Sequence, residues 1–195
     1  MSGRYGVGGP QPPSIGAGGP QPSDAGIAAS PGTRAIRDES GTETVRTTIN
    51  GEKVTAEVPA EELLLDFLRD RLGLTGAKQS CEVQVCGACT VLVDGDPVSS
   101  CCFLAADVDG REVETIEGLA GSDFHRRAAE AFMRHAAVQC GFCTSGMLLT
   151  AKALAARGIG GDRDQIATAM SGNLCRCTGY VSILDSLTEI LGGDQ

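Results

Sequence analysis

The stretch CEVQVCGACTVLVDG, residues 81–95, is the most informative part of this 195-residue sequence. Its three cysteines have the spacing C-x4-C-x2-C, and two further cysteines follow shortly downstream. Gly87 lets the backbone turn tightly inside the motif, because glycine adopts dihedral angles that other residues avoid. Several thiolates can therefore approach one point from a short loop, which predicts a metal centre. The candidate ligands are Cys81, Cys86, Cys89, Cys101 and Cys102.

This spacing is typical of a plant-type [2Fe–2S] cluster, in which four thiolates hold two irons. Such a loop also aims backbone N–H groups at the sulfurs, because hydrogen bonds to sulfur help to set the reduction potential. The alternative is zinc, but zinc ribbons usually pair one C-x2-C with a second C-x2-C. We therefore predict a cluster in this loop.

The segments around the loop predict an α+β domain of the β-grasp type over residues 43–119. Two pairs of apolar, alternating segments flank Asn50-Gly51 and Asp94-Gly95, which are strong hairpin signals because both positions tolerate positive φ. Between the hairpins, residues 61–72 show helical spacing of leucines, with Gly73 just past the end. The expected strands cover 45–49, 54–58, 90–93, 97–100 and 113–116.

The remainder, residues 120–195, predicts an all-α domain with the architecture of a small helical bundle. Its cysteines form a C-x2-C pair, Cys140 and Cys143, and a C-x-C pair, Cys175 and Cys177. Each pair lies next to an expected helix N-terminus, which lowers thiol pKa and favours thiolate ligation. Spacing alone leaves both zinc and a second cluster open for these four residues. The expected helices cover 123–137, 144–157, 163–171 and 181–191.

Other site types find no support in the sequence. A Rieske cluster needs two histidines on one iron, but His125 and His135 are the only two and neither neighbours a cysteine in the required pattern. The sequence has no G-x-G-x-x-G motif, no P-loop and no histidine near a cysteine nucleophile. We therefore expect a chain that conducts electrons and does not itself transform an organic substrate.

The N-terminal residues 1–42 differ from the rest in composition. The first 41 contain ten of the 27 glycines and six of the eight prolines, and GVGGPQP at 6–12 recurs as GAGGPQP at 16–22. Without apolar periodicity, ordering this segment would cost entropy with little burial to offset the cost. We predict a disordered tail.

Charge and hydropathy indicate the compartment and exclude some partners. The formal net charge of −9 disfavours nucleic acid and anionic membranes as partners. No signal peptide and no apolar stretch of 18 residues is present, so we expect no membrane span and a cytoplasmic location. Disulfides are rare in the cytoplasm, and this favours metal ligation as the role of the nine cysteines.

Four motifs together resemble the small iron–sulfur subunits of the xanthine oxidase, or molybdenum hydroxylase, family, and the resemblance covers about residues 43–192. It is closest to the separate small subunits of bacterial carbon monoxide dehydrogenase and of N-heterocycle and aldehyde dehydrogenases. The motifs are CEVQVCGACTVLVDG (81–95), SSCCFLA (99–105), QCGFCTSGM (139–147) and NLCRCTGY (173–180).

The resemblance implies two [2Fe–2S] clusters, one in each domain. Cys101 aligns with the fourth ligand of the first cluster. Adjacent strand residues point to opposite faces, so we expect Cys102 to be a spare thiol. The implied ligands are Cys81, Cys86, Cys89 and Cys101 for the first cluster and Cys140, Cys143, Cys175 and Cys177 for the second.

The resemblance also implies partners, in a dimer of heterotrimers. A large subunit would carry molybdopterin cytosine dinucleotide and a medium subunit FAD, and Gln139 would contact the pterin. Electrons from substrate would pass through the two clusters to FAD. The substrate stays open among carbon monoxide, a purine or other N-heterocycle, and an aldehyde. One departure is Gln84, because many family members have glycine there.

Two other functions compete with this interpretation. A free-standing two-cluster ferredoxin would be a diffusing carrier, although such a carrier needs only the first domain. A zinc-stapled interaction module would be colourless, whereas [2Fe–2S] proteins are red-brown.

Overall fold

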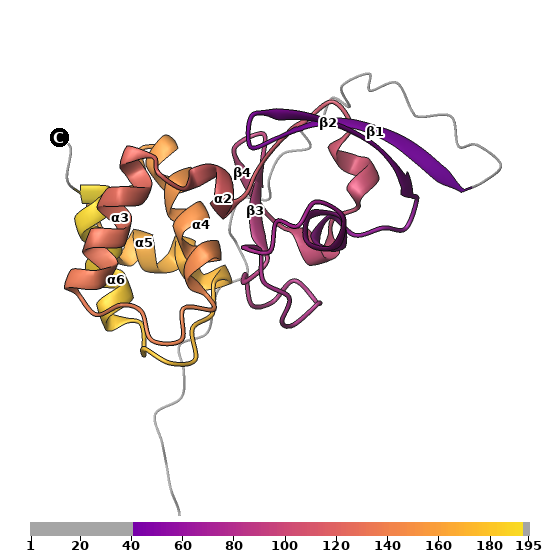
Figure 1. Ribbon diagram of the computed structural model, residues 1–195. Coiled ribbons are helices and arrows are strands. Elements are labelled where there is room, and N and C mark those ends of the chain that lie inside the picture. Colours follow the sequence, from indigo (N-terminus) through magenta and orange to yellow (C-terminus); the bar gives the residue numbers. More distant parts are fainter. Residues whose placement is uncertain (1–40, 193–195) are drawn as a thin grey trace, which may run out of the picture. The chain divides into compact units, whose positions relative to one another are not determined.

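The computed structural model describes residues 41–192 of the chain (Figure 1). The expected disordered tail lies outside the described residues except for its last two positions, and β1 begins at the second of these, Thr42. Among the helices of residues 41–192, none is long and apolar enough to cross a lipid bilayer.

The first domain contains a five-stranded mixed sheet with the strand order β2-β1-β5-β3-β4. β1 pairs with β2 and β3 with β4 as antiparallel hairpins, and the central β5 runs parallel to β1 and antiparallel to β3. This topology confirms the expected α+β arrangement. The strands are β1 (Thr42–Ile49), β2 (Glu52–Pro59), β3 (Thr90–Val93), β4 (Asp96–Ser99) and β5 (Glu112–Glu114).

Both hairpin turns form where the sequence predicts them. Asn50 and Gly51 have φ values of 53° and 83°, and Asp94 and Gly95 have 51° and 84°. Two successive positive φ values match the right-handed twist of the flanking strands. The last expected strand, 113–116, is wrong at its end, because the chain leaves the sheet after Glu114 and begins the short helix α2 (Ile116–Leu119).

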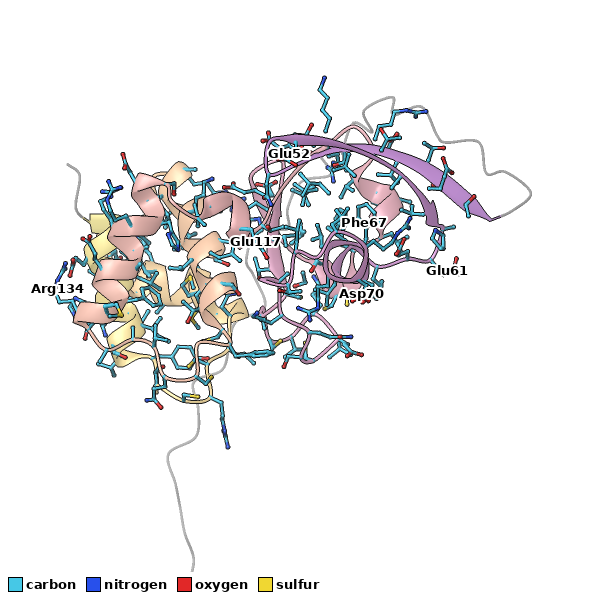
Figure 2. All side chains as sticks on the ribbon, viewed as in Figure 1. Glu52, Glu61, Phe67, Asp70, Glu117 and Arg134 are labelled. Atoms are coloured by element: carbon cyan, nitrogen blue, oxygen red, sulfur yellow. The ribbon has the colours of Figure 1, made fainter. Side chains whose placement is uncertain are left out.

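The helix that follows the first hairpin is shorter than expected. It comprises α1 (Leu64–Asp66) and a π-helical segment, η1 (Phe67–Arg71), and not the whole of 61–72. The preceding residues are engaged elsewhere: Glu62 N donates to Pro59 O in a turn, and Leu63 bridges to Leu104. Phe67, labelled in Figure 2, is buried with the leucines of this helix in the core of the sheet domain.

The second domain contains the four helices that the sequence predicts, with a core of their apolar side chains. The helix expected over 123–137 ends earlier, because Ala136 has φ 52° and leaves the helical region. Arg134, near its end, forms an ion pair with Glu189 of the last helix (Figure 2). The helices are α3 (Asp123–Arg134), α4 (Thr144–Ala156), α5 (Arg163–Ala169) and α6 (Val181–Gly192).

Strand β3 contributes to the cores of both domains. Val91 and Val93 belong to the core of the sheet domain, whereas Leu92 belongs to that of the helical domain. Successive strand residues point to opposite faces, so a strand that is buried throughout can join two cores. β3 therefore packs against α4 on one face and brings the end of the cysteine loop close to the helical domain.

Candidate iron–sulfur sites

The first candidate site is an irregular loop that ends where β3 begins. The backbone N–H groups of Val85 and Cys86 each lie 3.4 Å from Cys81 Sγ and donate to it. The N–H of Val83 has the largest effect and, together with these two donors, lowers the pKa of the Cys81 thiol to about 6. The loop thus has the feature that a thiolate ligand needs, which is a set of N–H groups aimed at its sulfur.

The four expected thiols of this site lie in two pairs. Cys81 and Cys86 interact with each other at the partly exposed end of the loop. Cys89 and Cys101 interact on the buried side, where burial raises the pKa of Cys89 to about 11. A [2Fe–2S] cluster takes two protein ligands on each of its irons, so two pairs of thiols fit this group.

The expectation that strand alternation separates Cys101 from Cys102 is wrong, because neither residue lies on a strand. Residues Ser100–Cys102 form a 3-10 turn (η2), because β4 ends at Ser99. The two thiols are nevertheless in different environments: Cys101 is 4% exposed, and Cys102 is exposed. Their sulfurs are 3.8 Å apart, and Cys102 Sγ lies 3.8 Å from the carbonyl oxygen of Glu82.

The second candidate site is formed by the segments that precede α4 and α6. Cys140 and Cys177, 37 residues apart in the chain, have their sulfurs 3.5 Å apart. Cys143 and Cys175 form a second interacting pair. Cys143 occupies the N-cap position of α4, without a side-chain capping hydrogen bond, so this pair precedes the helix as the sequence predicts. The tertiary structure therefore brings together four thiols that the sequence places in two separate motifs.

These thiols differ in how strongly they favour the thiolate. The N–H of Phe142 lowers the pKa of Cys140, whereas burial raises that of Cys143 to about 12. Burial also opposes ionisation of Cys175, but hydrogen bonds centred on Thr178 outweigh it and lower the pKa of that thiol.

The second set of thiols lines a cavity of about 330 Å³, whose wall also includes Cys86 and Ala88 of the first loop. Among residues 41–192, no three His, Cys, Asp or Glu side chains converge on a single point. The thiols lie in pairs, and two pairs of thiols fit the two irons of a [2Fe–2S] cluster.

The sequence motifs did not single out three residues that lie near the second site. Thr178 Oγ1 donates to Cys175 Sγ at 3.2 Å, and Tyr180 accepts a hydrogen bond from Cys175 N at 2.8 Å through its hydroxyl oxygen. Asn173 is buried and reaches the first loop. All three lie in the motif NLCRCTGY, so their proximity to the cysteines was the available signal.

Gln139 and the histidines are placed as follows. Gln139 is exposed beside Cys140, near the exposed side chains of Val138 and Phe142. His135 forms a hydrogen bond between Nε2 and Glu189 Oε2 at 2.8 Å, and the backbone of His125 takes part in the N-terminal cap of α3. The histidines thus have structural contacts within the helical domain.

Comparisons with known proteins agree with this geometry. Residues 47–120 match the family described as a 2Fe-2S iron-sulfur cluster binding domain, and residues 115–188 match the family described as a [2Fe-2S] binding domain. The nicotinate dehydrogenase small FeS subunit of Eubacterium barkeri is 45% identical over 140 residues, which are 72% of this chain and 89% of that protein. The chain belongs to the small iron–sulfur subunits of the molybdenum hydroxylase family.

Other members of this family support the assignment. The xanthine dehydrogenase iron-sulfur-binding subunit of Escherichia coli O157:H7 is 39% identical, over 78% of this chain and 96% of that protein. A chain of quinoline 2-oxidoreductase from Pseudomonas putida 86 superposes with a TM-score of 0.73 at 44% identity, covering 78% of this chain and 95% of that one.

Family membership confirms several predictions made from the sequence. It confirms the ferredoxin-like domain followed by a helical domain, with a [2Fe–2S]-binding domain in each position. It identifies this iron–sulfur subunit as a non-catalytic, electron-transfer component of a multi-subunit oxidoreductase. The zinc alternative for the helical domain is set aside by the same match.

Proposed function

We propose that this subunit conducts electrons between a molybdenum cofactor in a large subunit and FAD in a medium subunit. A [2Fe–2S] cluster accepts and releases one electron at a time, and the chain offers one such site in each domain. The observation that carries the proposal is the direct contact between the two sites, in which Leu174 N donates to Cys86 O at 2.8 Å. Leu174 adjoins Cys175, so the contact joins one candidate ligand to the neighbour of another.

The proposal assigns eight cysteines as ligands and leaves Cys102 unassigned. The thiol pairs and the N–H groups directed at Cys81 support this assignment. The first cluster would be held by Cys81, Cys86, Cys89 and Cys101. The second would be held by Cys140, Cys143, Cys175 and Cys177.

We infer the order of the two sites from the exposed residues around them. Gln139 adjoins Cys140 and is exposed, so it is available to contact the pterin of molybdopterin cytosine dinucleotide in the large subunit. The first loop presents Val83 and Val85, which are 64% and 58% exposed, to another partner. We place the helical-domain site next to molybdenum and the ferredoxin-like site next to FAD.

The proposed assembly is a dimer of heterotrimers in the cytoplasm, where cysteines stay reduced and available to metal. Its substrate would be an N-heterocycle, because relatives of 44–46% identity are named for nicotinate, nicotine and quinoline. A relative named for aldehydes is less similar, at 37% identity. The substrate itself would bind and react in the large subunit.

The order of the sites is tested with Cys86→Ser in the purified three-subunit complex. The substrate is a heterocycle that the wild-type complex oxidises, chosen from nicotinate, nicotine and quinoline. Without the first cluster, substrate should still reduce the helical-domain cluster but not FAD. Electron paramagnetic resonance (EPR) follows the cluster, and stopped-flow absorbance follows the flavin.

The matched control is Cys102→Ser, which removes a neighbouring thiol that is not proposed as a ligand. This variant should retain its iron and reduce FAD at the wild-type rate. Normal FAD reduction in a Cys86→Ser complex that has lost the first cluster would refute the proposed order.

A further inference from the structure

The loops of the two candidate sites are joined by a single buried side chain. Asn173 is 4% exposed, and its Nδ2 donates to Gly87 O at 3.1 Å and lies 3.4 Å from Thr90 Oγ1. Gly87 directly follows Cys86, and Asn173 precedes Cys175 by two residues. One carboxamide therefore links the residue after Cys86 with a position two residues before Cys175.

A backbone hydrogen bond lies beside this carboxamide. Leu174 N donates to Cys86 O, while the side chain of Asn173 donates to the next carbonyl along the first loop. Consecutive residues of one loop thus hold consecutive carbonyls of the other. The bonded route from Cys86 to Cys175 contains one hydrogen bond, from Leu174 N to Cys86 O.

At two glycines the contact between the loops leaves no room for a side chain. A Cβ atom on Gly87 would lie 2.3 Å from Gly172 O, and one on Gly146 of α4 would lie 2.2 Å from Gly87 O. Both distances are far below van der Waals contact. Any added side chain at these positions must therefore push the loops apart.

We infer that Asn173 is a positioning residue that sets the separation, and hence the electronic coupling, of the two clusters. This inference rests on the proposed function, because it requires both clusters to be present. The buried amide suits the role because it donates to the Gly87 carbonyl without bringing a charge into the contact. Removing the amide should let the loops separate while leaving every candidate ligand in place.

The experiment uses the purified complex after dithionite reduction, when both clusters are paramagnetic. Their magnetic interaction splits and broadens the low-temperature EPR signals, and it weakens as their separation grows. Asn173→Ala and Gly146→Ala both disturb the contact at Gly87 O. The first removes the amide that donates to this oxygen, and the second adds a Cβ atom against it. Both should keep the iron content of wild type and lose the splitting, with slower electron transfer between the clusters.

The matched control is Asn50→Ala. Asn50 also links two segments, since its side chain bonds to both the backbone and the hydroxyl of Thr115, but it lies within the sheet domain. Its loss should destabilise the chain and leave the EPR splitting unchanged. If Asn173 had only a structural role, Asn173→Ala would behave like Asn50→Ala and leave the EPR splitting unchanged.

The outcomes separate the inference from the proposed function. Wild-type complex with iron for fewer than two clusters would refute the proposed function itself. Unchanged splitting in either loaded variant would overturn only the role of Asn173. Loss of iron from both variants would also overturn it, because a positioning residue leaves the ligands able to bind iron.

Discussion

Cys101 and Cys102 are adjacent cysteines with the same chemistry and different surroundings. Cys101 lies in the core of the sheet domain beside Cys89, whereas Cys102 is exposed. Both residues lie in the 3-10 turn at the end of β4, which directs the Cys101 side chain inward and the Cys102 side chain outward. Burial beside Cys89, and not strand alternation, supports Cys101 as the ligand.

The two thiols make a matched pair for a test of the first site. Cys101→Ser should lose the iron of the first cluster, because the hydroxyl replaces a buried ligand. Cys102→Ser should keep that iron, because it changes only an exposed thiol. Iron analysis and the visible spectrum of each purified complex measure the outcome. The opposite result, with iron lost only from Cys102→Ser, would reverse the assignment.

Within the loop that carries the first three cysteines, the backbone makes several left-handed steps. Glu82, Gln84 and Gly87 have φ values of 57°, 58° and 67°. A residue with a side chain is disfavoured in this region by about 1–2 kcal/mol relative to its usual conformations. A glycine at position 84 would adopt this conformation without strain.

Gln84→Gly should therefore stabilise the loaded protein. Relief of about 1–2 kcal/mol of strain outweighs about 0.5–1 kcal/mol for the greater freedom of glycine in the unfolded chain. We expect a net gain of about 0.5–1 kcal/mol, seen as a higher midpoint of thermal unfolding when cluster absorbance is followed.

The control for this change is Gln165→Gly in α5, where the backbone is helical. The same substitution there relieves no strain and should cost about 0.5–1 kcal/mol. A midpoint that falls in both variants would show that position 84 is not strained.

The two domains of the subunit are joined by shared packing as well as by the chain. β3 supplies side chains to both cores, and the loop before it touches the segment that precedes α6. The iron sites thus lie on segments whose ends are held by regular structure. We expect both clusters to be retained when the two domains form one unit, and to be lost when either domain is separated from the other.

The N-terminal segment should be dispensable for this arrangement. Its composition lacks apolar anchors, and segments of this kind tolerate removal when few contacts hold them. Deletion of residues 1–40 keeps Gly41, whose carbonyl oxygen accepts a hydrogen bond from Ala60 N at 3.1 Å. We expect the shortened chain to retain wild-type iron content and to copurify with its partner subunits. Loss of either on deletion would identify the segment as a docking element.

Local patterns in the sequence were sufficient for most elements and for the metal centre of the first loop, whereas spacing alone left zinc open for the four cysteines of the helical domain. Hairpin turns, helix positions and cysteine spacing depend on residues that are neighbours in the sequence. Tertiary contacts were therefore not needed to interpret Asn50-Gly51, Asp94-Gly95 and the C-x4-C-x2-C motif. The predicted helix fails at residues 61–63, where Leu63 pairs with the distant Leu104. The predicted strand fails at residue 116, where the chain has left the sheet and begins α2.

Contacts between distant segments were decided only by the tertiary structure. The pairing of Cys140 with Cys177, the different burial of Cys101 and Cys102, and the link from Asn173 to Gly87 join residues that no local spacing relates. The physical reason is that a thiol pair or a buried amide depends on the packing of helices and strands, which fixes distances across the chain. Sequence alone determined which residues could bind iron, and packing determined which of them meet.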